Sequence, residues 1–144
     1  MNFRLVIYVT RKAHFNAAHR LHNPKKSDDW NKRVFGPCNH ANWHGHNYVL
    51  EVTVAGDPDP ETGYLLDLGS LKQIMHDRII SKCDHKNLNL DVDFLQGVIP
   101  SSENLARIFF HELKSDVDRI TPHGSLYSVK IFETERNIAE YREH

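Results

Sequence analysis

The sequence lacks most of the features that mark a specialised class of protein. It has only two cysteines in 144 residues, Cys38 and Cys83, which are too few for a disulfide scaffold. No apolar run approaches the roughly 18 residues of a membrane-spanning helix, and the five apolar residues after Arg4 have no small-residue cleavage site behind them. We therefore expect a cytoplasmic protein with reduced thiols and no membrane partner.

An excess of either charge is also missing. The 18 lysines and arginines nearly balance the 19 aspartates and glutamates, and no basic run is long enough for a nucleic-acid footprint. A partner bound by bulk charge, nucleic acid included, is therefore not expected. A chain of 144 residues can bury one hydrophobic core without disulfides or a structural metal, so we predict a single domain over residues 1–144.

Histidine is the residue that the sequence has in unusual number. There are 11 histidines, and three of them stand beside a thiol in "CNHANWHGHN", the segment Cys38 to Asn47. Histidine is the commonest metal ligand in proteins and titrates near neutral pH. The segment raises the question whether its imidazoles and thiol hold one metal ion together or have separate roles.

Alternation of apolar and polar residues predicts strands in the first half of the chain. Residues 5–21 alternate over their whole length and predict a long strand, with a bulge near Arg11 and Lys12. Residues 22–43 are polar and show no period, so we expect a long loop of functional importance there. Residues 46–56 alternate again and predict a second strand.

Helical spacing of apolar residues appears twice in the second half. Asp67 is the predicted N-cap of a helix that ends near Lys82, and Ser101 or Ser102 is the predicted cap of a helix within residues 100–117. Both helices have an apolar stripe on one side only. We therefore expect each of them to lie on the face of a sheet.

The remaining segments complete the order of elements. Residues 83–94 break the helical pattern and predict a loop, and residues 125–143 predict two strands joined by a tight turn at residues 135–137. The order is then strand, strand, helix, helix, strand, strand. It predicts an α+β domain with two helices on one face of an antiparallel sheet.

Strand geometry turns the histidines into a candidate metal site. His44 and His46 are two residues apart at the entry to the second strand, so extended backbone directs both to one face, whereas a helix would separate them by about 200°. Gly45 between them leaves room for close approach. Antiparallel pairing of the first two strands would add His19, and three neutral imidazoles suit a zinc ion with its fourth position left to water or substrate. The alternative is that His44 and His46 are hydrogen-bonded loop residues.

Two roles are open to Cys38. It could be the fourth ligand of a closed structural zinc site, or it could stand beside the metal, where an adjacent cation favours the thiolate as a base or nucleophile. A domain of this size does not need a structural zinc ion to fold, which favours the second role. His40 is not selected as a ligand by its spacing, and we expect it to be solvated.

Two further patches carry titratable groups. Asp84 and His85 are adjacent in a predicted loop, where they could be a carboxylate-supported proton carrier or an unrelated pair at a helix end. Glu133 ends a strand face on which Tyr127, Val129 and other apolar residues share its parity. A carboxylate there is costly unless it is paired, either by a ligand with two parallel N–H donors or by a nearby Arg or Lys.

Six blocks of the sequence together resemble one family. In order they are "FNAAHRL", "CNHANWHGHNY", "LDLGSLK", "CDHKNLN", "SSENLA" and "VKIFETERN". With them, nearly the whole chain resembles the 6-pyruvoyl-tetrahydropterin synthase family. The resemblance implies the tunnelling fold: ββααββ subunits form a trimeric β-barrel, and two trimers stack into a hexameric homo-oligomer with sites at subunit contacts.

The resemblance also implies roles for the candidate residues. The implied ligands of Zn²⁺, one ion per subunit, are His19, His44 and His46. Cys38 is the implied catalytic thiol, Asp84 and His85 the proton relay, and Glu133 the carboxylate that anchors the 2-amino and ring N–H edge of the pterin. Ser102 and Glu103 fall in the block that helps line the pterin pocket.

The implied reaction is elimination of triphosphate from 7,8-dihydroneopterin triphosphate, giving 6-pyruvoyl-tetrahydropterin. Reduction of the ring and oxidation of the side chain occur within one molecule, so no nicotinamide is required. Zinc would act as a Lewis acid on the side-chain hydroxyls, while Cys38 removes and His85 returns a proton. Mg²⁺ would be unsurprising with the triphosphate, although the sequence has no motif for it.

Two alternatives to this function stay open. One branch of the family makes 6-carboxy-tetrahydropterin for queuosine, and there the cysteine typically lies three residues before H-G-H, whereas five residues separate Cys38 from His44 here. The second alternative is a zinc-stabilised module that binds a pterin or a protein without turnover. Cys83 departs from the family, which usually has an apolar residue there, so we expect it to be a small buried side chain.

Overall fold

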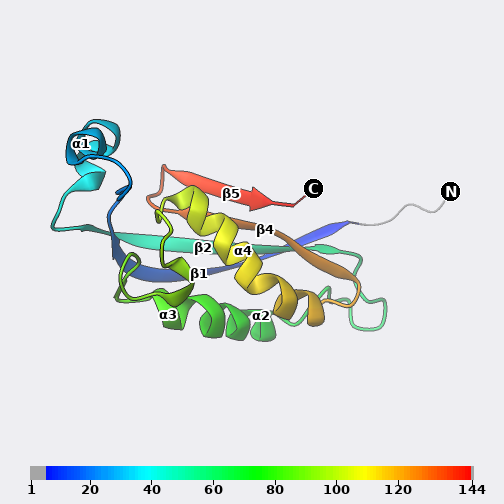
Figure 1. Ribbon diagram of the computed structural model, residues 1–144. Coiled ribbons are helices and arrows are strands. Elements are labelled where there is room, and N and C mark those ends of the chain that lie inside the picture. The colour runs from blue at the N-terminus through cyan, green and yellow to red at the C-terminus, as the bar shows by residue number, and fades with distance from the viewer. Residues whose placement is uncertain (1–5, 144) are drawn as a thin grey trace.

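A five-stranded sheet with helices over one face forms the body of the computed structural model, which describes residues 6–143 (Figure 1). The strand order is β3-β1-β2-β4-β5. The strands are β1 (Ile7–His19), β2 (His44–Gly56), β3 (Lys86–Asn87), β4 (Gly124–Phe132) and β5 (Ile138–Arg142). The helices are α1 (Asp28–Phe35), α2 (Leu68–Met75), α3 (Ser81–Cys83) and α4 (Ser102–Arg119).

The predicted α+β class is confirmed, but the sheet is mixed rather than antiparallel. The β1–β2, β2–β4 and β4–β5 pairs are antiparallel, whereas β3 pairs parallel to β1 at Ala17 and Ala18. The loop predicted over residues 83–94 therefore contains one short strand, which was not predicted. Two residues are too few to show an alternating pattern, so the pairing of β3 depends on the partner strand alone.

The bulge expected near Arg11 and Lys12 is absent from β1. The pairing of β1 with β2 runs without a shift from Ile7 opposite Gly56 to His19 opposite His44. Leu5, at the start of the predicted strand, lies outside the described residues.

The irregularity lies instead between β2 and β4. Thr53 pairs with Ser128 and Val54 pairs with Leu126, which leaves Tyr127 as an extra residue. Tyr127 is therefore not on the face of Val129, as its parity had suggested. The centroid of its ring lies 4.8 Å from that of Tyr8, and the two ring planes are tilted by 57°.

The segment between β1 and β2 is not the structureless loop that was predicted. It contains α1 and a 3-10 turn, Gly36–Asn39. Ser27 caps α1 by accepting a hydrogen bond from Trp30 N, and the buried amide of Asn31 donates to the carbonyl oxygens of Asn23 and Ser27. Polar capping, rather than an apolar stripe, defines this short helix, so a search for apolar periodicity misses it. In Figure 1, α1 lies beyond the ends of β1 and β2, apart from the helices over the sheet.

The caps of the two sheet-covering helices are confirmed. The Asp67 carboxylate accepts a hydrogen bond from Ser70 N at 2.9 Å, and Ser101 Oγ accepts one from Asn104 N at 3.2 Å. The helix expected to end near Lys82 continues from α2 through a π-helical turn, His76–Ile80, to the end of α3.

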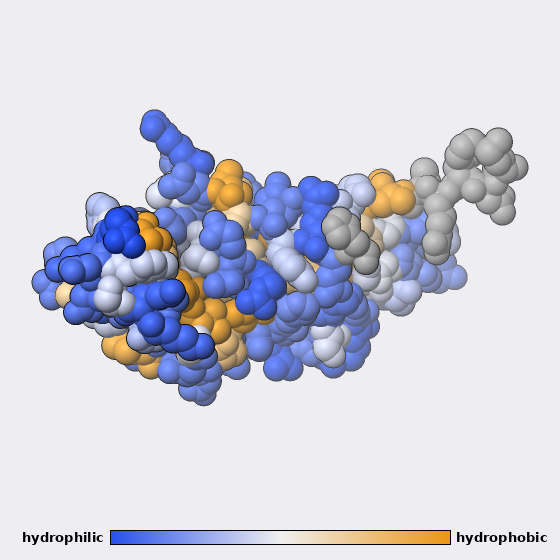
Figure 2. Space-filling model, turned by 45° about the horizontal axis from the view of Figure 1, so that its top comes forward, coloured by the Kyte–Doolittle hydropathy of each residue, from blue (hydrophilic) through white to orange (hydrophobic). Residues whose placement is uncertain are grey.

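The core lies between the sheet and these helices. β2 alternates strictly, so that Leu50 and its period-two neighbours are fully buried, in one core cluster with residues of α2 and α4. On the face shown in Figure 2, hydrophilic residues cover most of the surface, and apolar residues form one larger patch and a few smaller separate ones. Among residues 6–143, no helix is both long enough and apolar enough to span a membrane.

Truncation of this core tests the fold. We expect Leu50→Ala to lower the free energy of unfolding by about 2–5 kcal/mol, because the side chain is fully buried. Leu90→Ala, at a leucine that is 63% exposed, is the matched control and should cost about 0.5 kcal/mol or less. Urea unfolding followed by circular dichroism measures both, and equal effects would contradict the packing.

Candidate functional site

Three histidines meet at the end of the β1–β2 hairpin. His19 lies opposite His44, and His46 lies opposite Ala17, two residues earlier on β1. Their ring centroids are 4.5, 5.1 and 5.0 Å apart, and one nitrogen from each ring lies within 4.8 Å of the others. The predicted antiparallel pairing is confirmed, and it brings the three imidazoles together as a group that could hold a metal ion.

The environment keeps two of these rings neutral. His19 is 1% exposed, and burial lowers the pKa of its ring to about 4. Its Nδ1 donates to the Pro100 carbonyl oxygen at 2.8 Å, which leaves the lone pair on Nε2. Burial, and then the charge that His46 can carry, also lowers the pKa of His44. Neutral imidazoles are the form that binds a metal.

The polar atoms of the group fit a metal ion. Nδ1 of His44 and Nε2 of His46 are buried and have no hydrogen-bond partner within residues 6–143. Buried nitrogens are nearly always partnered in folded proteins. Two orphaned nitrogens beside a third neutral imidazole are what a bound cation would satisfy.

Tyr48 is a member of the site that the sequence analysis did not single out. Its hydroxyl lies 3.2 Å from Nδ1 and 3.4 Å from Nε2 of His19. Burial raises the pKa of Tyr48 well above its ordinary value, and the nearby Glu133 carboxylate and Cys38 thiol raise it further. The signal was present in the sequence, because His44, His46 and Tyr48 share one strand parity.

The Cys38 thiol is free, half-buried and close to this group. It lies on the 3-10 turn and near enough to the Tyr48 hydroxyl to influence its ionisation. His40, two residues on, is exposed and accepts a hydrogen bond at Nδ1 from Asn42 N. It stands apart from the three clustered histidines, as expected.

Glu133 lies directly beside the histidines. Its Oε1 is 3.6 Å from Nε2 of His46, and its Oε2 accepts a hydrogen bond from Ser102 Oγ at 3.1 Å. Within the described chain no lysine or arginine forms an ion pair with Glu133, so the second explanation for this carboxylate is not met. Glu133, Ser102 and Glu103 line one pocket of about 440 Å³, together with Arg136.

Asp84 and His85 form a real pair, held against β1. Asp84 Oδ1 accepts a hydrogen bond from Asn16 N at 2.8 Å, and His85 N donates to Asn16 O at 2.6 Å. Asp84 Oδ2 is 3.0 Å from His85 Nδ1. The hydrogen bond from Asn16, followed by that from His85, holds the pKa of Asp84 below its usual value. His85 adopts a left-handed φ of 61°, uncommon for a residue other than glycine.

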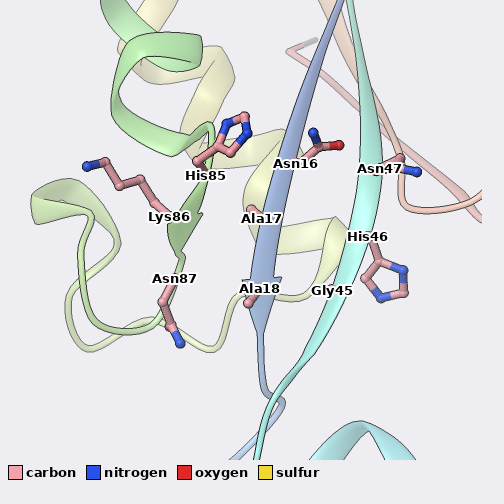
Figure 3. A pocket seen from close by; sticks show the side chains of 9 residues that line it. All are labelled: Asn16, Ala17, Ala18, Gly45, His46, Asn47, His85, Lys86 and Asn87. Carbon is pink, nitrogen blue, oxygen red and sulfur yellow. The ribbon is translucent and has the colours of Figure 1, made fainter.

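This pair lies apart from Glu133 within one chain. His85 lines a shallow pocket with Asn16, Gly45 and His46, whereas Glu133 lines other pockets. In Figure 3 the rings of His85 and His46 extend away from each other, with β1 and β2 between them. The structure therefore gathers the histidines, Tyr48, Glu133 and Ser102, and leaves His85 on the other side of the strand pair.

The expectation for Gly45 is not met, whereas the expectation for Cys83 is. A Cβ on Gly45 would lie 3.6 Å from Ala17 O, an ordinary contact, so the strands do not require glycine there for close approach. Cys83 is fully buried in the core, and burial raises the pKa of its thiol to about 12. The prediction of a small buried side chain at Cys83 is confirmed.

Together, the fold and the site define an α+β protein in which three histidines that could hold a metal ion lie beside a pocket lined by carboxylates. A sequence model described as 6-pyruvoyl tetrahydropterin synthase matches residues 8–144. The chain belongs to this family.

Individual relatives agree with this assignment. The chain is 42% identical over 134 residues to human 6-pyruvoyl tetrahydrobiopterin synthase, covering 93% of this chain and 90% of the relative. The solved structure of 6-pyruvoyl tetrahydropterin synthase from Caenorhabditis elegans superposes with a TM-score of 0.87 at 40% identity, over 99% of this chain and 100% of that one. The 6-carboxy-5,6,7,8-tetrahydropterin synthase of Bacillus subtilis is 28% identical over 137 residues, 93% of this chain and 84% of the relative.

Removal of one imidazole tests the metal site. We expect His44→Ala and His46→Ala each to lower the metal affinity by more than about 100-fold. Loss of a residue that only hydrogen-bonds a metal ligand already lowers the affinity by roughly 10–100-fold, and loss of a ligand itself should cost more. His14→Ala is the control, because His14 is an exposed histidine of β1 with the opposite parity to His19. Metal content after dialysis, measured by mass spectrometry of the elements, decides the result, and a His44→Ala protein with full metal content would contradict the site.

Proposed function

We propose that the protein is a zinc-dependent 6-pyruvoyl-tetrahydropterin synthase, which converts 7,8-dihydroneopterin triphosphate to 6-pyruvoyl-tetrahydropterin with elimination of triphosphate. The observation that carries the proposal is the 3.6 Å approach of the Glu133 carboxylate to His46, a member of the histidine group. A ring held by Glu133 would present its side chain to a metal on the histidines. The relatives that are 42% and 40% identical bear this enzyme's name.

Glu133 and Ser102 are the proposed anchors of the pterin. The Ser102 hydroxyl occupies Oε2 of Glu133 but leaves Oε1 without a hydrogen bond from a charged partner. The 2-amino group and ring N–H of a pterin offer two parallel donors, which a carboxylate accepts in a bidentate arrangement. The pocket of about 440 Å³ that these residues line with Glu103 is of the size that small-molecule ligands occupy.

His19, His44 and His46 are the proposed ligands of one Zn²⁺ per chain. When bound, zinc would supply Lewis acidity to the side-chain hydroxyls of the substrate and so acidify the adjacent C–H bonds. The Pro100 carbonyl oxygen holds Nδ1 of His19, which directs the lone pair of Nε2 toward the group. Mg²⁺ would accompany the triphosphate of the substrate.

Cys38 and His85 are the proposed proton carriers. The thiolate of Cys38 removes a proton from a carbon of the side chain, and triphosphate leaves with its bonding electrons. Asp84 accepts from Nδ1 of His85, so Nε2 is the atom at which His85 returns a proton to carbon. The oxidation of the side chain balances the reduction of the ring, and no external electron carrier is consumed.

The separation of His85 from Glu133 supports an assembled site. We propose that His85 completes the site of a neighbouring copy within a dimer of trimers, each trimer closing one β-barrel of the tunnelling fold. In the described part of the chain, β5 pairs only with β4, and β3 covers β1 only at Ala17 and Ala18. Such unpaired strand edges are the surfaces that barrel closure removes. The whole chain, residues 1–144, would be one domain of this assembly, working in the cytoplasm, where Cys38 and Cys83 stay reduced.

The product of turnover is the first test. The zinc-loaded protein is incubated with 7,8-dihydroneopterin triphosphate, and we expect a pterin with the mass of 6-pyruvoyl-tetrahydropterin together with free triphosphate. Five residues between Cys38 and His44, and the higher identity to the pyruvoyl enzymes than to the 28% identical carboxy enzyme, favour this product. A carboxy product with acetaldehyde would instead assign the protein to the queuosine route, and no product would leave a binding module.

Removal of the thiol is the second test. We expect Cys38→Ala to lower kcat by about 10²–10⁴-fold, the usual contribution of a general base, and to keep its bound zinc. Cys83→Ala is the matched control, because its thiol is fully buried in the core and burial raises its pKa, so that it is not available as a base. Full activity of Cys38→Ala would exclude the thiol as base. Unfolding of the wild type on chelation of zinc, followed by circular dichroism, would favour the zinc-stabilised module.

A further inference from the structure

Cys38 lies on a turn whose neighbouring residues are mostly exposed. Gly36, Pro37 and His40 are exposed, whereas Asn39, at the end of the turn, is only 5% exposed. A buried amide costs free energy unless its hydrogen-bonding groups are partnered. Asn39 is therefore the point at which this turn is fastened to the rest of the protein.

Both hydrogens of the Asn39 amide have acceptors. Nδ2 lies 2.8 Å from the Leu21 carbonyl oxygen and 2.9 Å from Nδ1 of His22. A flipped amide would set its oxygen against the Leu21 carbonyl oxygen, so the position of the nitrogen follows from the acceptor. His22 must then accept at Nδ1, and its Nε2 carries the hydrogen of the neutral ring.

Two more hydrogen bonds reach the backbone of the turn. Leu21 N donates to the carbonyl oxygen of Cys38 at 2.9 Å. Arg20 Nε donates to the carbonyl oxygen of Asn39 at 3.0 Å. The two residues at the end of the turn are thus joined to three consecutive residues that follow β1.

The segment that receives these bonds is itself fixed beside the metal site. It begins directly after His19, whose ring donates a hydrogen bond to the carbonyl oxygen of Pro100. Arg20 N donates to Asn89 Oδ1 at 2.9 Å, and Asn89 Nδ2 donates to Arg20 O at 3.0 Å. A continuous series of short contacts therefore links the thiol turn to a histidine of the metal group.

We propose that Asn39 is the positioning residue of the Cys38 thiol: its buried amide fastens the turn Gly36–Asn39 to the end of β1 and so fixes the thiol relative to His19. The catalytic consequence rests on the proposed function, whereas the effect on the thiol itself depends only on these contacts. Loss of the donors loosens the turn, which keeps only the hydrogen bonds from Arg20 and Leu21, and it removes no contact of Glu133 or of the metal group.

Two substitutions of Asn39 separate the loss of its N–H donors from the effect of an added charge. Asn39→Asp keeps the shape and removes both donors, and Asn39→Leu removes them without adding charge. We expect each to lower kcat by up to about 10²-fold, the cost of a displacement of about 1 Å at a reacting group, with KM and zinc content unchanged. Asn42→Asp, in the exposed part of the same loop, is the control and should behave as the wild type.

Alkylation of Cys38 by iodoacetamide gives a readout that does not require turnover. We expect a faster reaction in both Asn39 variants, because the freed turn exposes the thiol, and the buried Cys83 does not contribute. Unchanged kcat and unchanged alkylation in both variants would overturn the inference. If the wild type shows no turnover, the proposed function fails, and the alkylation rates alone decide the role of Asn39.

Arg20→Met covers the case in which the Asn39 variants do not fold. It removes the hydrogen bond to the Asn39 carbonyl oxygen from the other side of the contact. A lower kcat with faster alkylation and full zinc content supports the inference. Wild-type values of both quantities overturn it.

Discussion

The register of the β1–β2 hairpin is the constraint on which the rest of the site depends. It runs without a bulge from Ile7 to His19, so that His19 meets His44 while His46 follows on the same face. A slip of one residue would send both histidines of β2 to the opposite face, because side chains alternate along a strand. The fully buried residues of the same face, Leu50 among them, hold the register in place. The packing of the core thus determines the geometry of the metal group.

Much of the fold followed from the sequence because its long elements repeat a clear pattern. The strands β1 and β2 and the capped stripes of α2 and α4 were all predicted, although the bulge expected in β1 near Arg11 and Lys12 is absent. What failed was short or irregular: β3 has two residues, and α1 is defined by polar contacts such as those of Asn31. The bulge at Tyr127 was not located either, although the buried positions change parity between Leu126 and Val129, which is the sign that one extra residue leaves in a strand.

For the site, too, the features that follow from a local pattern were predicted and those that depend on distant contacts were not. The pairing of His19 with His44 needed only strand parity and one assumed hairpin. The contacts that tune the group come from far along the chain, since the Pro100 carbonyl oxygen that orients His19 is 81 residues away. No local pattern encodes such a contact. The separation of His85 from Glu133 was equally invisible, because adjacency in the sequence fixes the Asp84–His85 pair but not its place beside β1, away from Glu133.

One short stretch of β1 and its continuation, residues 16–22, positions all three chemical groups. Asn16 holds the Asp84–His85 pair through its backbone, His19 belongs to the metal group, and the three residues after it fasten the turn of Cys38. The backbone of Asn16 faces the edge of β1, whereas the side chain of His19 faces the metal group, so one stretch reaches both. A displacement of this stretch must therefore move relay, metal group and thiol together. Substitutions within it should combine non-additively, because residues that share one backbone element are coupled.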